Sequence, residues 1–392
     1  MISVQQAKQI IQDAALAPKI VKLPLSEAFG FTLAEDIIAT VDIPNFAQSS
    51  MDGYAFKFAD KDKPLSIIGE MAAGVANQLT IDTGQATRIF TGAPLPQGAD
   101  TVIMQEKVAV ENKLLTLQDD NLSFGLNVRP KGAEVKRGEL AIAKETYLSA
   151  AALGFLAGIG CTHTHVYAAP KLAIILTGNE LQEPGKPLEF GHVYEANSVI
   201  LTAALHKAGI NDITILRSDD NPETLTSVLK QALESNDVVL LNGGVSVGDY
   251  DYVVGATRAC GVEQKFHKIK QKPGKPLFFG TKHDKLVFGL PGNPSSGLTC
   301  FYEYVLPALE RSMHKQASVV VITATATHNY TKPAGLTHFL KAFYTEGKVT
   351  PLHAQESFRL HSFAQANCFI VLPEDSTGCT AGNTVEVHLL PL

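Results

Sequence analysis

The sequence predicts a multidomain α/β protein, in which a doubly wound, mostly parallel α/β domain is joined by an inserted β domain, a discontinuous N-terminal helical or mixed domain and a C-terminal β barrel or sandwich. Its 392 residues exceed what one ordinary hydrophobic core holds. Between residues 170 and 309, apolar strand-like runs alternate with helix-like segments, as in layered parallel sheets. Residues 65–128 and the chain after Met313 instead carry short strands and turns.

Composition excludes several classes of protein. The net charge is −6 and Lys and Arg form no run, which argues against a nucleic-acid partner. The five cysteines have no CxxC spacing and most lie in apolar surroundings, so we expect free thiols in a reducing compartment. No apolar run reaches membrane-spanning length, and an amphipathic segment follows Met1 in place of a signal peptide. We therefore expect a cytoplasmic protein that acts on small molecules, with no membrane partner.

The first third of the chain predicts a domain interrupted by another. Ser3 and Gln6 form a capping-box pattern at the start of a helix over residues 4–15. Short strands fill residues 65–128, and an apolar helix at 148–159 returns the chain to the first domain. The predicted domains are therefore residues 1–44 with 130–168, 45–129, 169–314 and 315–392.

The last two domains differ in their periodicity. In the α/β domain we expect strands at 172–176, 213–216, 238–241, 277–279 and 286–288, and helices at 198–208, 222–235, 251–260 and 295–309. In the C-terminal domain we expect only strands, at 319–327, 335–344, 348–352, 368–372 and 384–389.

A candidate site follows the predicted strand at 238–241, in the sequence NGGVSVGDYD. Gly243, Gly244 and Gly248 allow the backbone to bend and to approach a ligand closely. Asp249 and Asp251 then place two carboxylates beyond the carboxyl end of the strand, where open α/β sheets bind ligands.

Two further stretches follow later strands. KPGKP carries Lys272 and Lys275 on a turn stiffened by proline. In GLPGNPSSG, Asn293 can cap a helix that begins at Pro294, so the N–H groups near Ser296 can face an anion. Each piece alone is typical of a turn or a solvated loop. Their recurrence at successive strand ends predicts a site for a phosphorylated ligand with a metal ion.

These stretches, together with MDGYA at residues 51–55 and TGAPLP at 91–96, resemble the molybdopterin molybdenumtransferase family, which includes the C-terminal domain of gephyrin. The resemblance covers nearly the whole chain. It implies insertion of molybdenum from molybdate into adenylylated molybdopterin, with Mg²⁺-dependent cleavage of the diphosphate and release of AMP.

The resemblance also implies roles for individual residues. The expected catalytic residues are Asp52, Thr91, Glu180, Asp219, Asp251 and Lys275, and the expected metal ligands are Asp249, Asp251, Glu180 and Glu134. The expected substrate contacts are Gly243, Gly244, Ser246, Gly248, Lys272, Pro291, Asn293, Pro294, Ser296, Arg129, Lys341 and Ser362. The run from Asp219 to Asn221 could equally serve as a helix cap.

The chain departs from the family pattern at three positions. Asn179 and Glu134 stand where aspartate is usual, and Lys341 stands where arginine would bind an oxyanion with two donors. A diverged paralogue, a non-enzymatic molybdopterin-binding scaffold like gephyrin, and a molybdopterin adenylyltransferase therefore remain as alternatives. The resemblance further implies a homodimer with a shared cleft, and an adenylyltransferase partner that delivers the substrate.

Overall fold

The structure is a computed structural model that describes residues 1–14, 16–74, 78–245 and 252–391. The chain divides into two compact units: residues 1–21, 30–32 and 165–392 form the first, and residues 22–29 and 33–164 form the second. Among the described residues, no helix combines the length and hydropathy that a membrane crossing requires. The predicted multidomain α/β class is confirmed. The described residues include a mostly parallel sheet, a closed barrel and a separate sheet in the second unit.

A six-stranded sheet forms the centre of the first unit. Its strand order is β16–β13–β17–β21–β20–β18. The first four strands are parallel, β20 runs antiparallel to β21, and β18 runs antiparallel to β20. The strands are β13 (Leu172–Thr177), β16 (Ile213–Ser218), β17 (Val238–Asn242), β18 (Glu263–His267), β20 (Phe278–Lys282) and β21 (Lys285–Leu290). Asn242 of β17 is paired with both Leu176 and Leu290, so three carboxyl ends meet at one edge.

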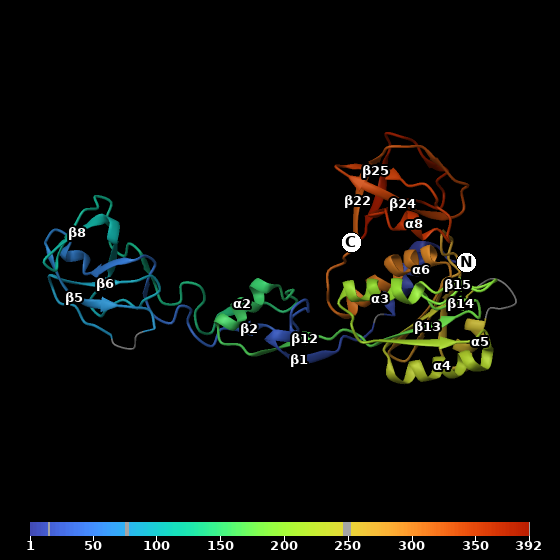
Figure 1. Ribbon diagram of the computed structural model, residues 1–392, viewed down its shortest axis with the longest axis horizontal. Helices are drawn as coiled ribbons and strands as arrows, with labels where there is room; N and C mark the ends of the chain where they lie inside the picture. Colours follow the sequence, from blue (N-terminus) through green and yellow to red (C-terminus); the bar gives the residue numbers. More distant parts are fainter. Residues whose placement is uncertain (15, 75–77, 246–251, 392) are drawn as a thin grey trace. The chain divides into compact units, whose positions relative to one another are not determined.

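Helices cover both faces of this sheet. Alternate residues of β13 and β17 pack on different helices, because successive side chains of a strand point to opposite faces. Ile174 and Leu240 belong to the core with α3 (Asn197–Ala208) and α6 (Pro294–Cys300). Ala173 and Val239 belong to the core with α4 (Pro222–Ser235) and α5 (Tyr252–Ala259). Figure 1 shows α3 and α6 on one side of β13 and α4 on the other.

The helix starts agree with the sequence signals. Helix α1 (Val4–Asp13) has the full capping box of Ser3 and Gln6. Helix α4 is capped by Asn221, whose side chain accepts hydrogen bonds from the backbone N–H groups of Glu223 and Thr224. The expected cap in the run from Asp219 to Asn221 is therefore supplied by Asn221.

The helix predicted over residues 295–309 is interrupted. Helix α6 is followed by a π-helical segment, η4 (Phe301–Val305), and then by α7 (Leu306–Ser312). Pro307 has no N–H for an α-helical bond, so the backbone pattern changes in the turn before it. All five residues of η4 are buried, including Glu303 and Tyr304.

The C-terminal β domain is a closed barrel. Strands β24, β25, β22, β28 and β26 pair in that order, and β26 pairs back with β24. The elements are β22 (Val320–Ala326), β24 (Thr337–Thr345), β25 (Lys348–Pro351), α8 (Leu360–Phe363), β26 (Cys368–Leu372) and β28 (Thr384–Leu389). A short strand from the α/β domain, β19 (Gln271–Lys272), pairs with β24. Strands β23 (Tyr330–Thr331) and β27 (Gly378–Cys379) form a separate pair.

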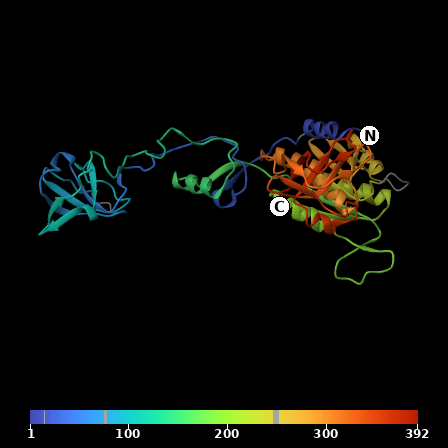
Figure 2. The ribbon, with the colours of Figure 1, turned by 90° about the horizontal axis from the view of Figure 1, so that it is seen from above.

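The barrel and helix α1 share one hydrophobic core with the α/β domain. Phe339 and Phe369 of the barrel are in the same buried cluster as Tyr304, and so are Ala7 and Ile11 of α1. Figure 2 shows α1, in blue beside the label N, next to the orange and red C-terminal part of the chain. The short strands β14 (Leu181–Gln182) and β15 (Val193–Tyr194) form a separate parallel pair beyond β13.

The second unit contains another six-stranded sheet, of order β7–β4–β6–β5–β9–β8. Its strands are β4 (Gly53–Phe56), β5 (Leu65–Met71), β6 (Gln85–Ile89), β7 (Thr101–Met104), β8 (Val108–Glu111) and β9 (Leu114–Leu117). The remaining elements are η1 (Leu25–Glu27), β2 (Ile37–Ile38), β3 (Gln48–Ser49), η2 (Phe58–Asp60), η3 (Gln105–Lys107), β10 (Val128–Arg129), β11 (Leu140–Ile142) and α2 (Ala150–Gly158). Strands β1 (Ile20–Pro24) and β12 (His163–Tyr167) include the residues where the chain passes between the units.

Candidate functional site

A cavity of about 610 Å³ lies at the carboxyl edge of the central sheet. Its walls come from the segments that follow three parallel strands. The residues predicted from the sequence that line it are Glu180 after β13, Gly243 and Gly244 after β17, and Pro291, Asn293 and Pro294 after β21. The structure therefore brings together at one cavity six residues that are far apart in the sequence.

The two glycines are required by the backbone at this edge. Gly243 has φ +96° and Gly244 has φ +66°. A Cβ at Gly243 would lie 2.6 Å from the carbonyl oxygen of Thr177, so no larger residue fits between β13 and β17. The glycines expose backbone at the wall of the cavity, where a bulky anion can approach it.

Two buried amides, which the sequence analysis did not identify, fix the neighbouring loop. The Nδ2 of Asn197 donates to Oδ1 of Asn242 at 2.7 Å and to the carbonyl of Gly292 at 2.8 Å. The Nδ2 of Asn242 donates to the carbonyl of Pro291 at 3.3 Å. The sequence did carry a signal for Asn242, which directly follows four apolar strand residues. An amide in that position is expected to be buried, and a buried amide needs hydrogen-bond partners.

Carboxylates gather on one side of the cavity. Glu180 and Asp220 both line it, and the Glu180 carboxylate folds back over Gly178. Asn179 and Asp220 bond reciprocally: Asn179 N donates to Asp220 Oδ2 at 3.3 Å, and Asp220 N donates to Asn179 Oδ1 at 3.2 Å. Asp219 lines an adjoining hollow of about 290 Å³ with Asn179.

These groups fit a magnesium ion only in part. Mg²⁺ is usually held by one or two carboxylates, with water and substrate phosphate completing the shell, and Glu180 and Asp220 provide two carboxylates at one cavity. Within residues 1–14, 16–74, 78–245 and 252–391 there is no cluster of three or more potential ligands. Ser246, Gly248, Asp249 and Asp251 lie outside the described residues. The other expected ligand, Glu134, is an exposed residue of the second unit, and its N–H donates to the Ile43 carbonyl.

The loop that carries the two lysines is held by a buried glutamine. The Nε2 of Gln271 donates to the carbonyls of Pro273 at 3.0 Å and Gly274 at 3.2 Å. Gly274 has φ +83°, and a Cβ there would lie 2.5 Å from Cys300 Sγ. Lys272 and Lys275 are exposed, and the following residue, Pro276, lines the cavity. A fixed backbone thus carries two ammonium groups in solvent.

The start of helix α6 differs from the expectation. Asn293 and Pro294 occupy the predicted N-cap and first helical positions, but the Asn293 side chain makes no capping bond. Its Nδ2 instead donates to Ser357 Oγ at 3.1 Å. Ser296 is 3% exposed and does not line the cavity, so anion binding by its N–H remains a prediction.

The ammonium of Lys341, expected to contact an anion, is bonded to backbone carbonyls in the structure. Lys341 is 2% exposed, and its Nζ donates to three carbonyls: Ala354 at 2.9 Å, Arg359 at 3.0 Å and Glu356 at 3.4 Å. An ammonium has three donors, so none is left for an anion. Burial lowers the pKa of Lys341. Strand β24 is buried on both faces at this point, and an anion contact of Lys341 remains a prediction.

Ser362 has the same structural role as Lys341. It is 4% exposed, and its hydroxyl donates to the carbonyl of Ala354 at 2.8 Å and also to that of Arg359. We name residues 352–359 the barrel loop, since it leaves the C-terminal barrel after β25. The barrel loop brings Phe358 to the wall of the cavity, a contribution that no motif in the sequence indicated.

Two of the expected catalytic residues meet in the second unit. Asp52 Oδ1 accepts hydrogen bonds from the backbone N–H and the hydroxyl of Thr91, both at 2.7 Å. The backbone bond from Thr91, followed by the hydroxyl bond, lowers the pKa of the Asp52 carboxyl. Arg129 is exposed on β10 in the same unit. The Asp52 and Thr91 side chains therefore act as a pair on an exposed turn.

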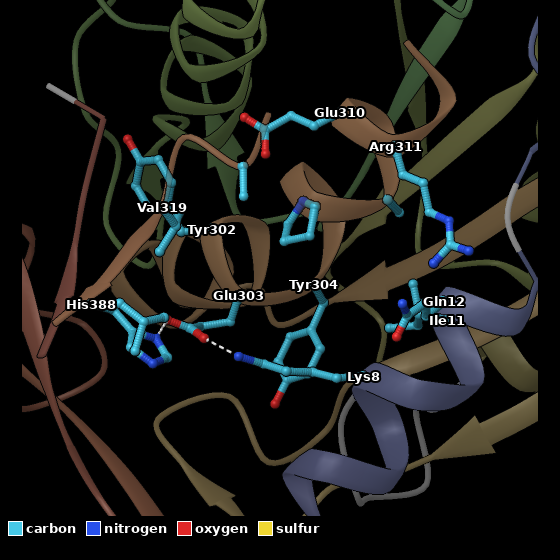
Figure 3. Close-up of a pocket in the computed structure, with 14 residues that line it drawn as sticks. Lys8, Ile11, Gln12, Tyr302, Glu303, Tyr304, Glu310, Arg311, Val319 and His388 are labelled. Atoms are coloured by element: carbon cyan, nitrogen blue, oxygen red, sulfur yellow. Dashed lines mark hydrogen bonds and ion pairs between the residues drawn. The ribbon is translucent and has the colours of Figure 1, made fainter. Parts of the chain in front are cut away.

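A second cavity, of about 350 Å³, shares no lining residue with the first. It lies between helix α1, segment η4, helix α7 and strands β22 and β28. Figure 3 shows Glu303 between Lys8 and His388 at its floor. The Glu303 carboxylate is 2.6 Å from Lys8 Nζ and 2.8 Å from His388 Nδ1. This cluster joins the N-terminal helix to the C-terminal barrel.

Three protein-family models match the chain. A model described as the MoeA N-terminal region (domain I and II) matches residues 2–160. One described as a probable molybdopterin binding domain matches residues 173–311, and one described as the MoeA C-terminal region (domain IV) matches residues 323–390.

Known proteins are similar to this chain over its full length. The molybdopterin molybdenumtransferase of Staphylococcus epidermidis is 34% identical, over 99% of this chain and 95% of the relative. That of Haemophilus influenzae is 33% identical, over 100% of both chains. Two solved structures of the molybdopterin biosynthesis MoeA protein from Pyrococcus horikoshii are also similar. The first has a TM-score of 0.86 and 30% identity, over 99% of both chains. The second has a TM-score of 0.82 and 29% identity, over 99% of this chain and 100% of the other.

Proposed function

Since this chain belongs to the molybdopterin molybdenumtransferase family, a family of transferases, we propose that it inserts molybdenum from molybdate into adenylylated molybdopterin. In this reaction the diphosphate of the adenylylated pterin is cleaved and AMP is released. The observation that carries the proposal is the cavity at the carboxyl edge, which brings together a glycine-rich wall, the carboxylates of Glu180 and Asp220, and Pro276, the residue that follows Lys275.

Each wall of the cavity has a part in the proposed reaction. The backbone at Gly243 and Gly244 lies open to the diphosphate, which needs close approach without side-chain obstruction. Lys275, with Lys272, supplies positive charge for an oxyanion in a protein of net charge −6. The amides of Asn197 and Asn242 hold the loop at Pro291 in place while the ligand binds.

The carboxylate side of this cavity fits a magnesium ion in part, because two of the carboxylates that could hold it, those of Glu180 and Asp220, line the cavity. Bound there, the ion would neutralise negative charge that develops on the diphosphate. Glu180 is exposed, so its carboxylate is free of the cost of burying a charge when no ligand is bound.

The proposal is tested with purified protein, adenylylated molybdopterin, molybdate and Mg²⁺. We expect AMP release and molybdenum bound to the pterin in equal amounts. Ligand binding without AMP release would instead favour a scaffold, and adenylylation of molybdopterin by ATP would favour an adenylyltransferase. AMP release at a rate far below that of a relative assayed in parallel would favour a diverged paralogue.

We also propose a cytoplasmic homodimer that receives its pterin from an adenylyltransferase. Five free cysteines support the reducing compartment, and the placement of Asp52 and Thr91 in a different unit from the cavity supports a shared cleft. Light scattering over working concentrations tests the dimer, and a uniform monomer would contradict it. Faster turnover when the substrate is generated by the adenylyltransferase than when it is added free would support the delivery partner.

A further inference from the structure

Two aromatic side chains are exposed at the wall of the cavity, Tyr194 and Phe358, and Phe358 is the more exposed of the two. Phe358 is 62% exposed, although phenylalanine in a stable fold is usually buried. It lies on the barrel loop and lines the cavity with Gly243 and Asn293. An exposed aromatic ring at a polar cavity is a typical feature of a surface that binds another flat, apolar face.

We propose that the ring of Phe358 stacks on a planar heteroaromatic ring of the bound ligand. This inference rests on the proposed function, in which the ligand carries two such rings, a pterin and an adenine. The shared chemistry is a flat π-face, and aromatic side chains stack on it without needing specific hydrogen bonds.

The backbone on both sides of Phe358 is held before any ligand binds. The ammonium of Lys341 holds the carbonyls of Ala354 and Glu356, which precede Phe358, and of Arg359, which follows it. The adjacent Ser357 accepts a hydrogen bond from Asn293 at the cavity wall. Because this backbone is already ordered, a ligand that stacks on the ring has only the side chain left to order, which lowers the entropic cost of the contact.

The neighbouring charge suits a ring that is attached to phosphate. The guanidinium of Arg359 is 5.5 Å from the centre of the Phe358 ring and 3.2 Å from the Glu356 carboxylate. Gly243 and Gly244, which line the same cavity, leave the backbone open to a diphosphate. A flat ring on Phe358 and a diphosphate at the glycines would both lie in this cavity.

The sequence contains no tryptophan, so a Phe358→Trp variant reports on this position alone. Its fluorescence is measured while AMP, a soluble pterin or ribose 5-phosphate is added. We expect saturable quenching by AMP if adenine stacks, or by the pterin if that ring stacks, and no quenching by ribose 5-phosphate. Phe343→Trp is the matched control, because Phe343 is 46% exposed on β24 and does not line the cavity.

A second pair of variants measures affinity. Phe358→Leu should raise the half-saturating concentration of the stacking ligand about 5- to 150-fold, whereas Phe358→Tyr should leave it nearly unchanged. If Phe358→Leu weakened the binding of ribose 5-phosphate as much as that of the ringed ligand, the loop would be disturbed and the stacking contact would be overturned. It would also be overturned if neither AMP nor the pterin quenched the fluorescence of Phe358→Trp.

The two proposals fail in different ways. If the unmodified protein releases AMP from adenylylated molybdopterin but neither ring quenches Phe358→Trp, the stacking inference is wrong and the proposed function stands. If a ring quenches the variant but no molybdenum is inserted by the unmodified protein, the stacking contact stands and the proposed function is wrong.

Discussion

The hydroxyl of Tyr304 donates a hydrogen bond to Oε1 of Gln271, and both side chains are almost wholly buried. This contact links the π-helical segment η4 to the loop that carries Lys272 and Lys275. The same glutamine holds the loop through its Nε2, so Tyr304 orients the group that fixes the loop.

Tyr304→Phe should therefore leave a buried acceptor without its donor. We expect the free energy of unfolding to fall by about 1–3 kcal/mol in urea titrations at pH 7. The molybdate concentration for half-maximal insertion should also rise, because Lys275 loses its fixed backbone. Tyr302→Phe is the control, since the Tyr302 hydroxyl makes no hydrogen bond among the described residues, and equal effects of both variants would refute the role of Tyr304.

Lys275→Ala should weaken molybdate binding selectively. One charge-assisted contact contributes about 1.5–3 kcal/mol, so the half-maximal molybdate concentration should rise about ten- to a hundredfold. Binding of the adenylylated pterin should change less, because backbone groups at Gly243 and Gly244 face the diphosphate. Molybdate is titrated at saturating pterin, with exposed Lys230→Ala on α4 as the control. Lost pterin affinity at an unchanged molybdate requirement would assign Lys275 to the phosphate.

Lys341→Met should destabilise the barrel loop. The substitution leaves three carbonyls without the ammonium that now bonds them, and we expect a loss of roughly 2 kcal/mol or more in unfolding free energy. Digestion by a protease should then cut near residues 352–359 earlier than in the unmodified protein. Exposed Lys348→Met on β25 should change neither quantity. An uncut loop with full stability would show that Lys341 is dispensable.

Glu303 should make stability depend on pH in acid. Burial alone would raise the pKa of Glu303, but hydrogen bonds and charge from His388 and Lys8 outweigh burial and leave the pKa below its ordinary value of 4.5. Because the folded pKa is the lower one, the contribution is complete above pH 4.5 and is lost as the pH falls through the folded value.

Glu303→Gln should consequently cost about 1–3 kcal/mol at pH 7, because Glu303 is buried but its partner Lys8 is 39% exposed and remains solvated. The difference from the unmodified protein should shrink steadily below pH 4.5 in denaturant titrations. Glu183→Gln, which removes a half-exposed carboxylate beside Lys186, should show no measurable change. A difference that stayed constant from pH 7 to pH 3 would contradict the assignment.

Asp52 should be required for its charge rather than for its shape. In Asp52→Asn, the Oδ1 atom can still accept both hydrogen bonds from Thr91, so the thermal midpoint should hardly change. If the carboxylate takes part in the proposed reaction, turnover should fall on the order of a hundredfold. Asp52→Ala removes the bonds as well and should also loosen the turn. Full turnover in Asp52→Asn would restrict Asp52 to holding Thr91.

Local signals in the sequence were enough to predict many elements. Residues 222–235, 368–372 and 384–389 are predicted with the bounds that the structure has. Asn221 and Pro222 mark a helix start by their own backbone preferences, and apolar periodicity marks the strands. Gly243 and Pro291 reach one cavity because the carboxyl ends of parallel strands meet at one edge.

Contacts between distant segments could not be predicted in the same way. The hydrogen bond from Tyr304 to Gln271 spans 33 residues and depends on a π-helical turn that propensity does not reveal. The burial of Lys341 could not be predicted, because six successive residues of β24 are buried, which a strand with one solvated face would not show. Phe358 reaches the cavity from a different domain, and no local pattern encodes that approach.

The ion pair of Lys8 and Glu303, completed by His388, has a consequence for synthesis of the protein. Lys8 and Glu303 are separated by 295 residues, and Glu303 and His388 by a further 85. A chain that emerges from the ribosome amino end first exposes helix α1 long before either partner exists. The apolar face of α1, with Ala7 and Ile11, can settle into its final core only when translation is almost finished. Until then this helix is a nascent segment that other proteins of the cell can reach.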